Sequence, residues 1–158
     1  MKFKVILTVF LIFTLLLNMS YSQKAETIGE FIIKIVRAMG LEKELPKKYT
    51  DRNCLTLLRK KGLIDESLFI KLSPMLNKPL TKEIVAFILV DVWDLKDKLP
   101  ANAKPQDYIN LLVKYGVMEP GKPTDIVSSD EVARFFENPI CAQALSAPHL
   151  KPVSPVRP

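Results

Sequence analysis

The chain has 158 residues, of which 48% are hydrophobic, and a formal net charge of +6. This length is enough for one modest domain. The five glycines are scattered along the chain, so no glycine-rich phosphate loop is present in the sequence. With a single histidine, the sequence gives little basis for a catalytic triad or a metal site.

The N-terminal segment 1–22 has the layout of a secretory signal peptide. Two lysines precede an apolar run over 5–17, and Ser20 and Ser22 occupy positions −3 and −1 of a cleavage site. The run is shorter than the roughly 20 residues that span a bilayer, which favours a cleaved signal over an uncleaved anchor. We therefore expect an exported protein, in the periplasm or at the cell surface, whose mature form does not span the membrane. Export also makes nucleic acid a poor partner, and loss of the two lysines lowers the net charge from +6 to +4.

The first half of the expected domain contains one long and two shorter helices. Apolar residues in 26–39 recur at helical spacing, and Thr27 with Glu30 forms a capping box at its start. Shorter helices are predicted over 50–62, which ends in a glycine, and over about 65–72.

The second half repeats this arrangement. Segment 81–95 is the most apolar of the predicted helices, and a shorter helix over 104–116 again ends in a glycine. A third long helix over 128–137 begins with Ser128 and Glu131, which form a second capping box. No segment alternates with period two, so the sequence predicts an all-α fold.

Four prolines and no helical periodicity distinguish the C-terminal segment 140–158. We predict that this segment is a flexible tail. The expected organisation is a signal peptide over 1–22, a helical domain over 23–139 and the Pro-rich tail.

An internal repeat relates the two halves. The stretch "LTLLRKKGLI" (55–64) matches "INLLVKYGVM" (109–118) at an offset of 54 residues, and the same offset places Thr27 on Thr81. The third long helix starts at Ser128, which follows Thr81 by 47 residues. We predict about two and a half long-helix/short-helix repeats, stacked because one unit cannot bury its apolar face alone.

These units resemble S-layer homology domains. "PLTKEIVAFILVDVWDL" (79–95) is similar to the signature helix of that family, and "TIGEFIIKIVRAMGL" (27–41) and "SSDEVARFF" (128–136) have a similar layout. The resemblance covers 26–138. It implies a non-catalytic module that binds an envelope component, either a cell-wall polysaccharide or an envelope protein.

The resemblance also indicates candidate ligand-binding residues. An Arg of the family motif, which contributes to binding anionic polysaccharide, is replaced here by Ile28, Lys82 and Ser129, so only Lys82 keeps the positive charge. Lys82, Glu83 and Trp93 are the candidates that follow. Trp93 has two interpretations, as a core residue or as the wall of a ligand groove.

Cys54 and Cys141 are the only cysteines. In an oxidising compartment they could form a disulfide; the alternative is two separate thiols, with Cys54 packed as a small hydrophobic residue.

The one histidine, His149, lies in the predicted tail, and the Asp91–Asp97 region lacks the glycine and terminal glutamate of a calcium loop. We therefore expect no enzyme, cofactor or metal, and the alternative function is a periplasmic structural or chaperone-like protein-interaction domain.

Overall fold

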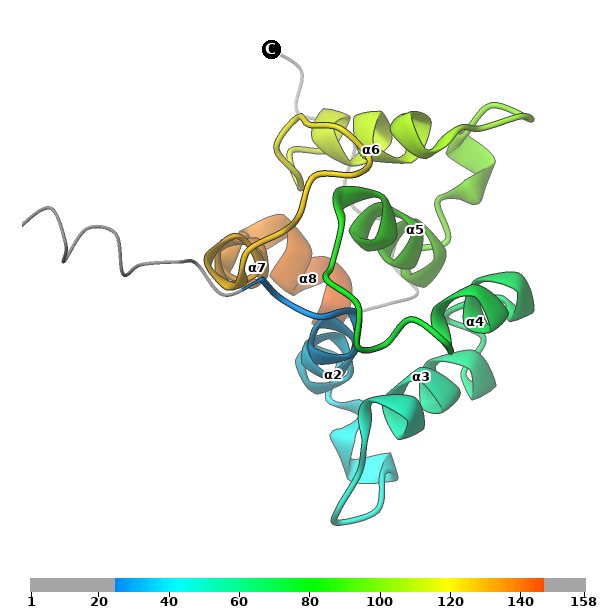
Figure 1. Cartoon of the computed structure of the whole chain (residues 1–158), viewed down its shortest axis with the longest axis vertical. Coiled ribbons are helices and arrows are strands. Elements are labelled where there is room, and N and C mark those ends of the chain that lie inside the picture. Colours follow the sequence, from blue (N-terminus) through cyan, green and yellow to red (C-terminus); the bar gives the residue numbers. More distant parts are fainter. Residues whose placement is uncertain (1–24, 147–158) are drawn as a thin grey trace, which may run out of the picture.

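The computed structural model describes residues 25–146, and this part of the chain consists of helices joined by short connections, without a strand (Figure 1). The predicted all-α class is therefore confirmed. The α-helices are α2 (Ile28–Ala38), α3 (Asp51–Lys60), α4 (Glu66–Leu72), α5 (Lys82–Val92), α6 (Pro105–Lys114), α7 (Ser129–Glu137) and α8 (Pro139–Ser146), with short 3-10 helices η1 (Leu41–Glu44) and η2 (Lys96–Lys98).

The internal repeat is confirmed by the bounds of the helices. α2 and α5 begin and end 54 residues apart, and so do α3 and α6. The turns after these helices also correspond. Gly40 and Asp94 are left-handed with φ of 68° and 52°, and Gly62 and Gly116 are left-handed with φ of 68° and 69°. The predicted glycine stops of the shorter helices are thus real.

A closed ring of three backbone hydrogen bonds holds the starts of the long helices together. The amide of Glu26 donates to the carbonyl of Val127 at 3.3 Å, Val127 donates to Leu80 at 2.8 Å, and Leu80 donates to Glu26 at 2.7 Å. Each of these residues lies two positions before the first residue of α2, α5 or α7. The three long helices therefore start from one point of the fold (Figure 1).

The capping boxes differ between the long helices. Thr27 and Glu30 form the predicted box at the start of α2. At α7 the Ser128 side chain accepts from the Glu131 amide at 3.2 Å, but the Glu131 carboxylate pairs with Lys82 in the second unit. Of the capping box predicted for α7, the hydrogen bond from the Glu131 amide to Ser128 is therefore formed, whereas the Glu131 carboxylate contacts Lys82 of another helix.

The prediction of a flexible tail from residue 140 is wrong for its first part, because 139–146 forms α8. Cys141, Ala144 and Leu145 are buried and recur at i, i+3 and i+4, which gives this helix an apolar face. That face packs against α2 and α7, and Pro139 is tolerated at the first helical position. The expected signal peptide and the rest of the predicted tail lie outside the described residues.

α5 is the most buried of the described helices, as its apolar sequence predicts, since eight of its 11 residues are buried. Within residues 25–146, every helix is too short or too polar to cross a membrane.

Candidate binding site

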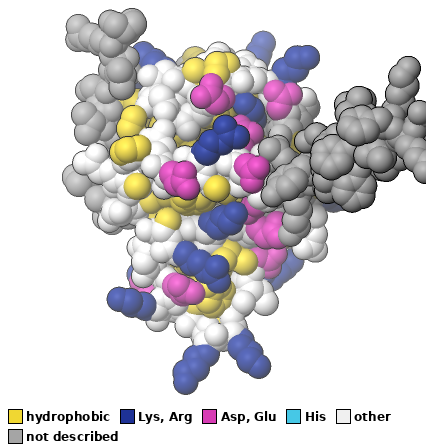
Figure 2. Space-filling view, turned by 90° about the vertical axis from the view of Figure 1, so that its left-hand side faces the viewer, with side chains coloured by type: hydrophobic (Ala, Val, Ile, Leu, Met, Phe, Trp, Pro, Cys, Tyr) yellow, Lys and Arg dark blue, Asp and Glu magenta, His cyan; other side chains and the backbone are white. Residues whose placement is uncertain are grey.

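A pocket of about 640 Å³ lies where the second repeat meets the third long helix. Its walls come from α5, α6, α7 and the connection 115–128, and Phe31 of α2 closes one side. Aliphatic and aromatic side chains make up most of the lining, and the polar members are Lys82, Ser128, Glu119, Glu131, Arg134 and Asn138. The face of the molecule seen from the side of α7 shows a recessed band of hydrophobic side chains between basic and acidic ones (Figure 2).

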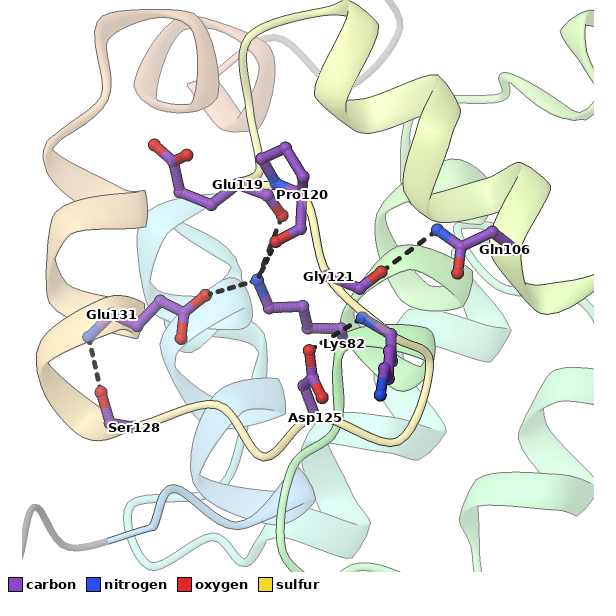
Figure 3. Close-up of polar contacts among 9 residues, drawn as sticks. Lys82, Gln106, Glu119, Pro120, Gly121, Asp125, Ser128 and Glu131 are labelled. Carbon is purple, nitrogen blue, oxygen red and sulfur yellow. Dashed lines mark hydrogen bonds and ion pairs between the residues drawn. The ribbon is translucent and has the colours of Figure 1, made fainter.

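Lys82 is the only predicted ligand-binding residue that lines this pocket. The residue is 7% exposed, and its Nζ donates to the backbone carbonyls of Glu119 and Pro120, both at 3.1 Å (Figure 3). The carboxylate of Glu131 lies 3.5 Å from the same nitrogen. Because an ammonium has three donors, these partners occupy its hydrogen-bonding capacity, and the charge serves the protein's own structure.

The connection 115–128 is fixed along the pocket by further contacts. The Gln106 side chain donates to the carbonyl of Gly121 at 3.1 Å (Figure 3). The amide of Lys82 donates to the carbonyl of Asp125 at 3.0 Å. A Cβ atom on Gly121 would lie 2.8 Å from the Cδ of Lys82. A larger residue at this position would therefore push against the Lys82 side chain, which the connection crosses.

Glu83 and Trp93 do not join Lys82 in a common site. Glu83 is half-buried in the first turn of α5, its amide donates to the carbonyl of Pro123 at 3.1 Å, and it is absent from the pocket lining. Trp93 is 1% exposed and belongs to the hydrophobic core. The interpretation of Trp93 as a groove wall is thus wrong, and its interpretation as a core residue is confirmed.

The disulfide between Cys54 and Cys141 is not formed, and both residues are buried as free thiols. Cys54 lies in α3 and Cys141 in α8, and both belong to the hydrophobic core. Burial raises the pKa of the Cys54 thiol to about 11 and that of the Cys141 thiol to about 12. Both therefore stay protonated at neutral pH and pack as small hydrophobic residues.

The acidic residues near the end of α5 anchor a helix. Asp91 has a side chain that is only 4% exposed, and its carboxylate accepts from the amide of Asp65 at 3.1 Å, just before α4. Lys96 forms ion pairs with both carboxylates. The hydrogen bond from Lys96 lowers the pKa of Asp65 to about 2, whereas burial raises that of Asp91. In the described part of the chain, no group of three His, Cys, Asp or Glu side chains is arranged to hold a metal ion.

Sequence reasoning did not find most of the pocket. Val113, Arg134 and Phe135 line the pocket. In the sequence they are ordinary positions of amphipathic helices, and nothing in the pattern indicates a binding site. A usable signal was the change of offset between repeats, from 54 to 47 residues, because it shows that the second connection is shorter than the first.

No family model matches the chain, and neither a curated protein nor a solved structure matches it. The resemblance to S-layer homology domains therefore stays a prediction from the sequence motifs.

Proposed function

We propose that this protein is an exported, non-catalytic module that binds a component of the cell envelope in the pocket between α5, α6 and α7. The observation that carries the proposal is the pocket itself. Its volume of about 640 Å³ lies in the range typical of ligand sites, and it combines apolar walls with a few polar groups, as such sites do. Export and the envelope setting are supported by the signal-like segment 1–22.

The chemistry of the pocket supports binding rather than catalysis. Its two central charges, Lys82 and Glu131, are paired with each other, and Lys82 also holds the connection 115–128. A general acid or base would need a group that is free to exchange a proton with a substrate. These two groups instead support the architecture of the site.

A polypeptide fits the lining better than an anionic polysaccharide does. Polysaccharide binding, as implied by the family resemblance, would use the cation in the place of Lys82, which is already engaged. Arg134 is then the one cationic side chain of the lining without a hydrogen bond or ion pair among residues 25–146. Val113, Met118 and Phe135 line the pocket and are only partly buried, so they offer apolar surface that would be buried against apolar side chains of a protein ligand. The alternative, a periplasmic chaperone-like interaction domain, would use the same pocket for many partners instead of one.

The proposal is tested by capture from a cell-envelope extract that is divided into polysaccharide and protein fractions. The mature protein is expected to retain one stoichiometric protein, and Val113→Trp is expected to abolish retention because the larger side chain fills the pocket from α6. Ile70→Trp is the matched control, since Ile70 is 63% exposed on α4 and is not part of the pocket.

Thermal unfolding of both variants checks that they are folded. Retention that is unaffected by Val113→Trp would contradict the proposed site. Retention of a polysaccharide alone would favour the ligand implied by the family resemblance, and a set of unrelated proteins would favour the chaperone-like alternative.

A further inference from the structure

The pocket lies in the second repeat at the place where the first repeat carries α4. The chain between α3 and α5 covers residues 61–81, and the chain between α6 and α7 covers 115–128. The difference is seven residues, which equals the length of α4. The first connection thus contains a helix that the second connection lacks.

The missing stretch can be located within the connection. Met118 corresponds to Ile64 at the offset of 54, and Gly121 corresponds to Pro74 at the offset of 47. Nine residues, including α4, lie between Ile64 and Pro74, whereas only Glu119 and Pro120 lie between Met118 and Gly121. The carbonyls of this short link are the ones that Lys82 holds, and both residues line the pocket.

Three residues of α3 and α5 contact α4 or its N-cap in the first repeat. Arg59 forms an ion pair with Glu66 at 3.2 Å, and its guanidinium lies 4.1 Å from the ring centroid of Phe69. The ring of Phe87 lies 4.1 Å from the ammonium of Lys71, and Asp91 accepts from the amide of Asp65, the N-cap.

The residues equivalent to these three all line the pocket. Val113 corresponds to Arg59 at the offset of 54, and Arg134 and Asn138 correspond to Phe87 and Asp91 at the offset of 47. The positions that contact α4 in the first repeat therefore line the pocket in the second repeat, where residues 25–146 provide no helix to cover them.

We propose that the pocket binds a short amphipathic helix of a partner protein, seated as α4 is seated in the first repeat. This inference rests on the proposed function of the pocket as a binding site. α4 buries Leu68 and Leu72, which lie four residues apart on one face, so the partner helix carries apolar residues at the same spacing. This is the helix-in-groove mode of peptide recognition.

The charges of the pocket define the partner helix further. In the first repeat the ring of Phe87 contacts Lys71, and the second repeat has Arg134 in place of Phe87. Arg134 is exposed, and its side chain forms no hydrogen bond or ion pair among residues 25–146. The partner helix therefore carries an acidic residue at the position of Lys71. In the first repeat Arg59 pairs with Glu66, and the second repeat has Val113 in place of Arg59. The partner helix therefore carries an uncharged residue at the position of Glu66.

The test uses two synthetic peptides derived from residues 64–74, "IDESLFIKLSP". Both carry Ile70→Lys with a lactam between this lysine and Glu66, because isolated helices of this length are marginal in water. The side chains joined by the lactam face solvent in α4, with Glu66 and Ile70 each 63% exposed. One peptide keeps Lys71, and the other carries Lys71→Glu.

Binding to the isotope-labelled mature protein is followed by NMR titration. Both peptides are expected to shift amides of the pocket, and the Lys71→Glu peptide is expected to bind about two- to fivefold more tightly, as for an exposed ion pair. Arg134→Glu is expected to reverse this preference. Lys114→Glu is the matched control, since Lys114 is exposed on α6 and is not part of the pocket.

The outcomes separate this inference from the proposed function. No shift at the pocket, or a preference between the peptides that Arg134→Glu leaves unchanged, would overturn the helix proposal. If Val113→Trp still abolished capture of an envelope component in that case, the proposed function would stand with a ligand of another kind. If the peptides bound but no envelope component were captured, the pocket would accept a helix and the envelope function would fail.

Discussion

Lys82 shows how one side chain acquires a different role from its equivalents in the other repeats. Its counterpart in the first repeat is Ile28, which is fully buried in the core. In the second repeat the methylene carbons of Lys82 pass Gly121, and the ammonium donates to two backbone carbonyls of the short connection. A buried charge is stable only with such partners, so Lys82 and the short connection depend on each other.

Replacing Lys82 by Met is expected to destabilise the protein by about 2–3 kcal/mol, because two carbonyls lose a charged donor. Urea unfolding of the mature protein measures this change. Lys78→Met is the matched control, since Lys78 is exposed and its side chain has no ion pair in the described part of the chain. Equal effects of the two substitutions would show that Lys82 does not hold the connection.

Asp94 is the one described residue other than glycine with a positive φ, 52°, and its repeat equivalent is Gly40. Asp94→Gly is expected to stabilise the protein by about 0.5–1 kcal/mol, because glycine adopts this conformation without steric cost. The reverse exchange, Gly40→Asp, is expected to destabilise by a similar amount, since a Cβ there meets no atom within 4 Å and only the backbone matters. Thermal unfolding measures both, and shifts of the same sign would refute the explanation.

Helix α4 distinguishes the two repeats at the scale of elements. It is short, yet its N-cap Asp65 is tied to the long helix α5 through Asp91 and Lys96. These contacts, together with buried Leu68 and Leu72, keep the helix on the groove between α3 and α5. The same groove in the second repeat has no such helix among residues 25–146, and the pocket lies there.

Asp65→Asn is expected to weaken this anchor in a pH-dependent way. The folded-state pKa of Asp65 is lowered to about 2, below the value of about 3.9 in an unfolded chain. The stability from its charge is therefore present above about pH 4 and is lost as the pH falls towards 2. Asn keeps the N-cap acceptor, so the variant isolates the loss of charge.

The measurement is the difference in unfolding free energy between wild type and Asp65→Asn from pH 7 down to pH 2. We expect about 1 kcal/mol or less at pH 7, because Asp65 is partly exposed, and no difference near pH 2. The difference is used because Asp91, with a raised pKa, titrates in the opposite sense. A difference that stays constant across this range would show that the charge of Asp65 does not contribute.

The whole molecule is closed by contacts between its first and last described parts. The hydrogen-bonded ring joins Glu26 to Val127, and α8 packs against α2. The third long helix has no short partner like α3 or α6 within residues 25–146. α8 instead follows α7 after a single residue and covers part of α2, which connects the incomplete third unit to the first.

Leu145→Ala is expected to destabilise the protein by about 2–4 kcal/mol, because Leu145 is 1% exposed and its truncation leaves a cavity between α8 and the rest of the core. Chemical unfolding measures the change, with Gln143→Ala on the exposed face of α8 as the control, expected within about 0.5 kcal/mol of wild type. Similar small effects would indicate that α8 is not part of the cooperative fold.

The sequence by itself determined the local structure of this protein. The all-α class, the capping box of Thr27, the glycine stops and the offset of 54 residues all follow from periodicity and from residues close together in the chain. Such features depend on hydrogen bonds and side-chain spacing within one helix, so they are visible without a fold.

Only the tertiary structure decided what these helices build. The burial of Lys82 and Trp93, the free thiols of Cys54 and Cys141, and the pocket depend on which distant segments meet. The pocket exists because a connection seven residues shorter leaves the second groove without the helix that covers the first. Sequence periodicity reports which face of a helix is apolar, and the packing of the whole chain decides whether that face is covered.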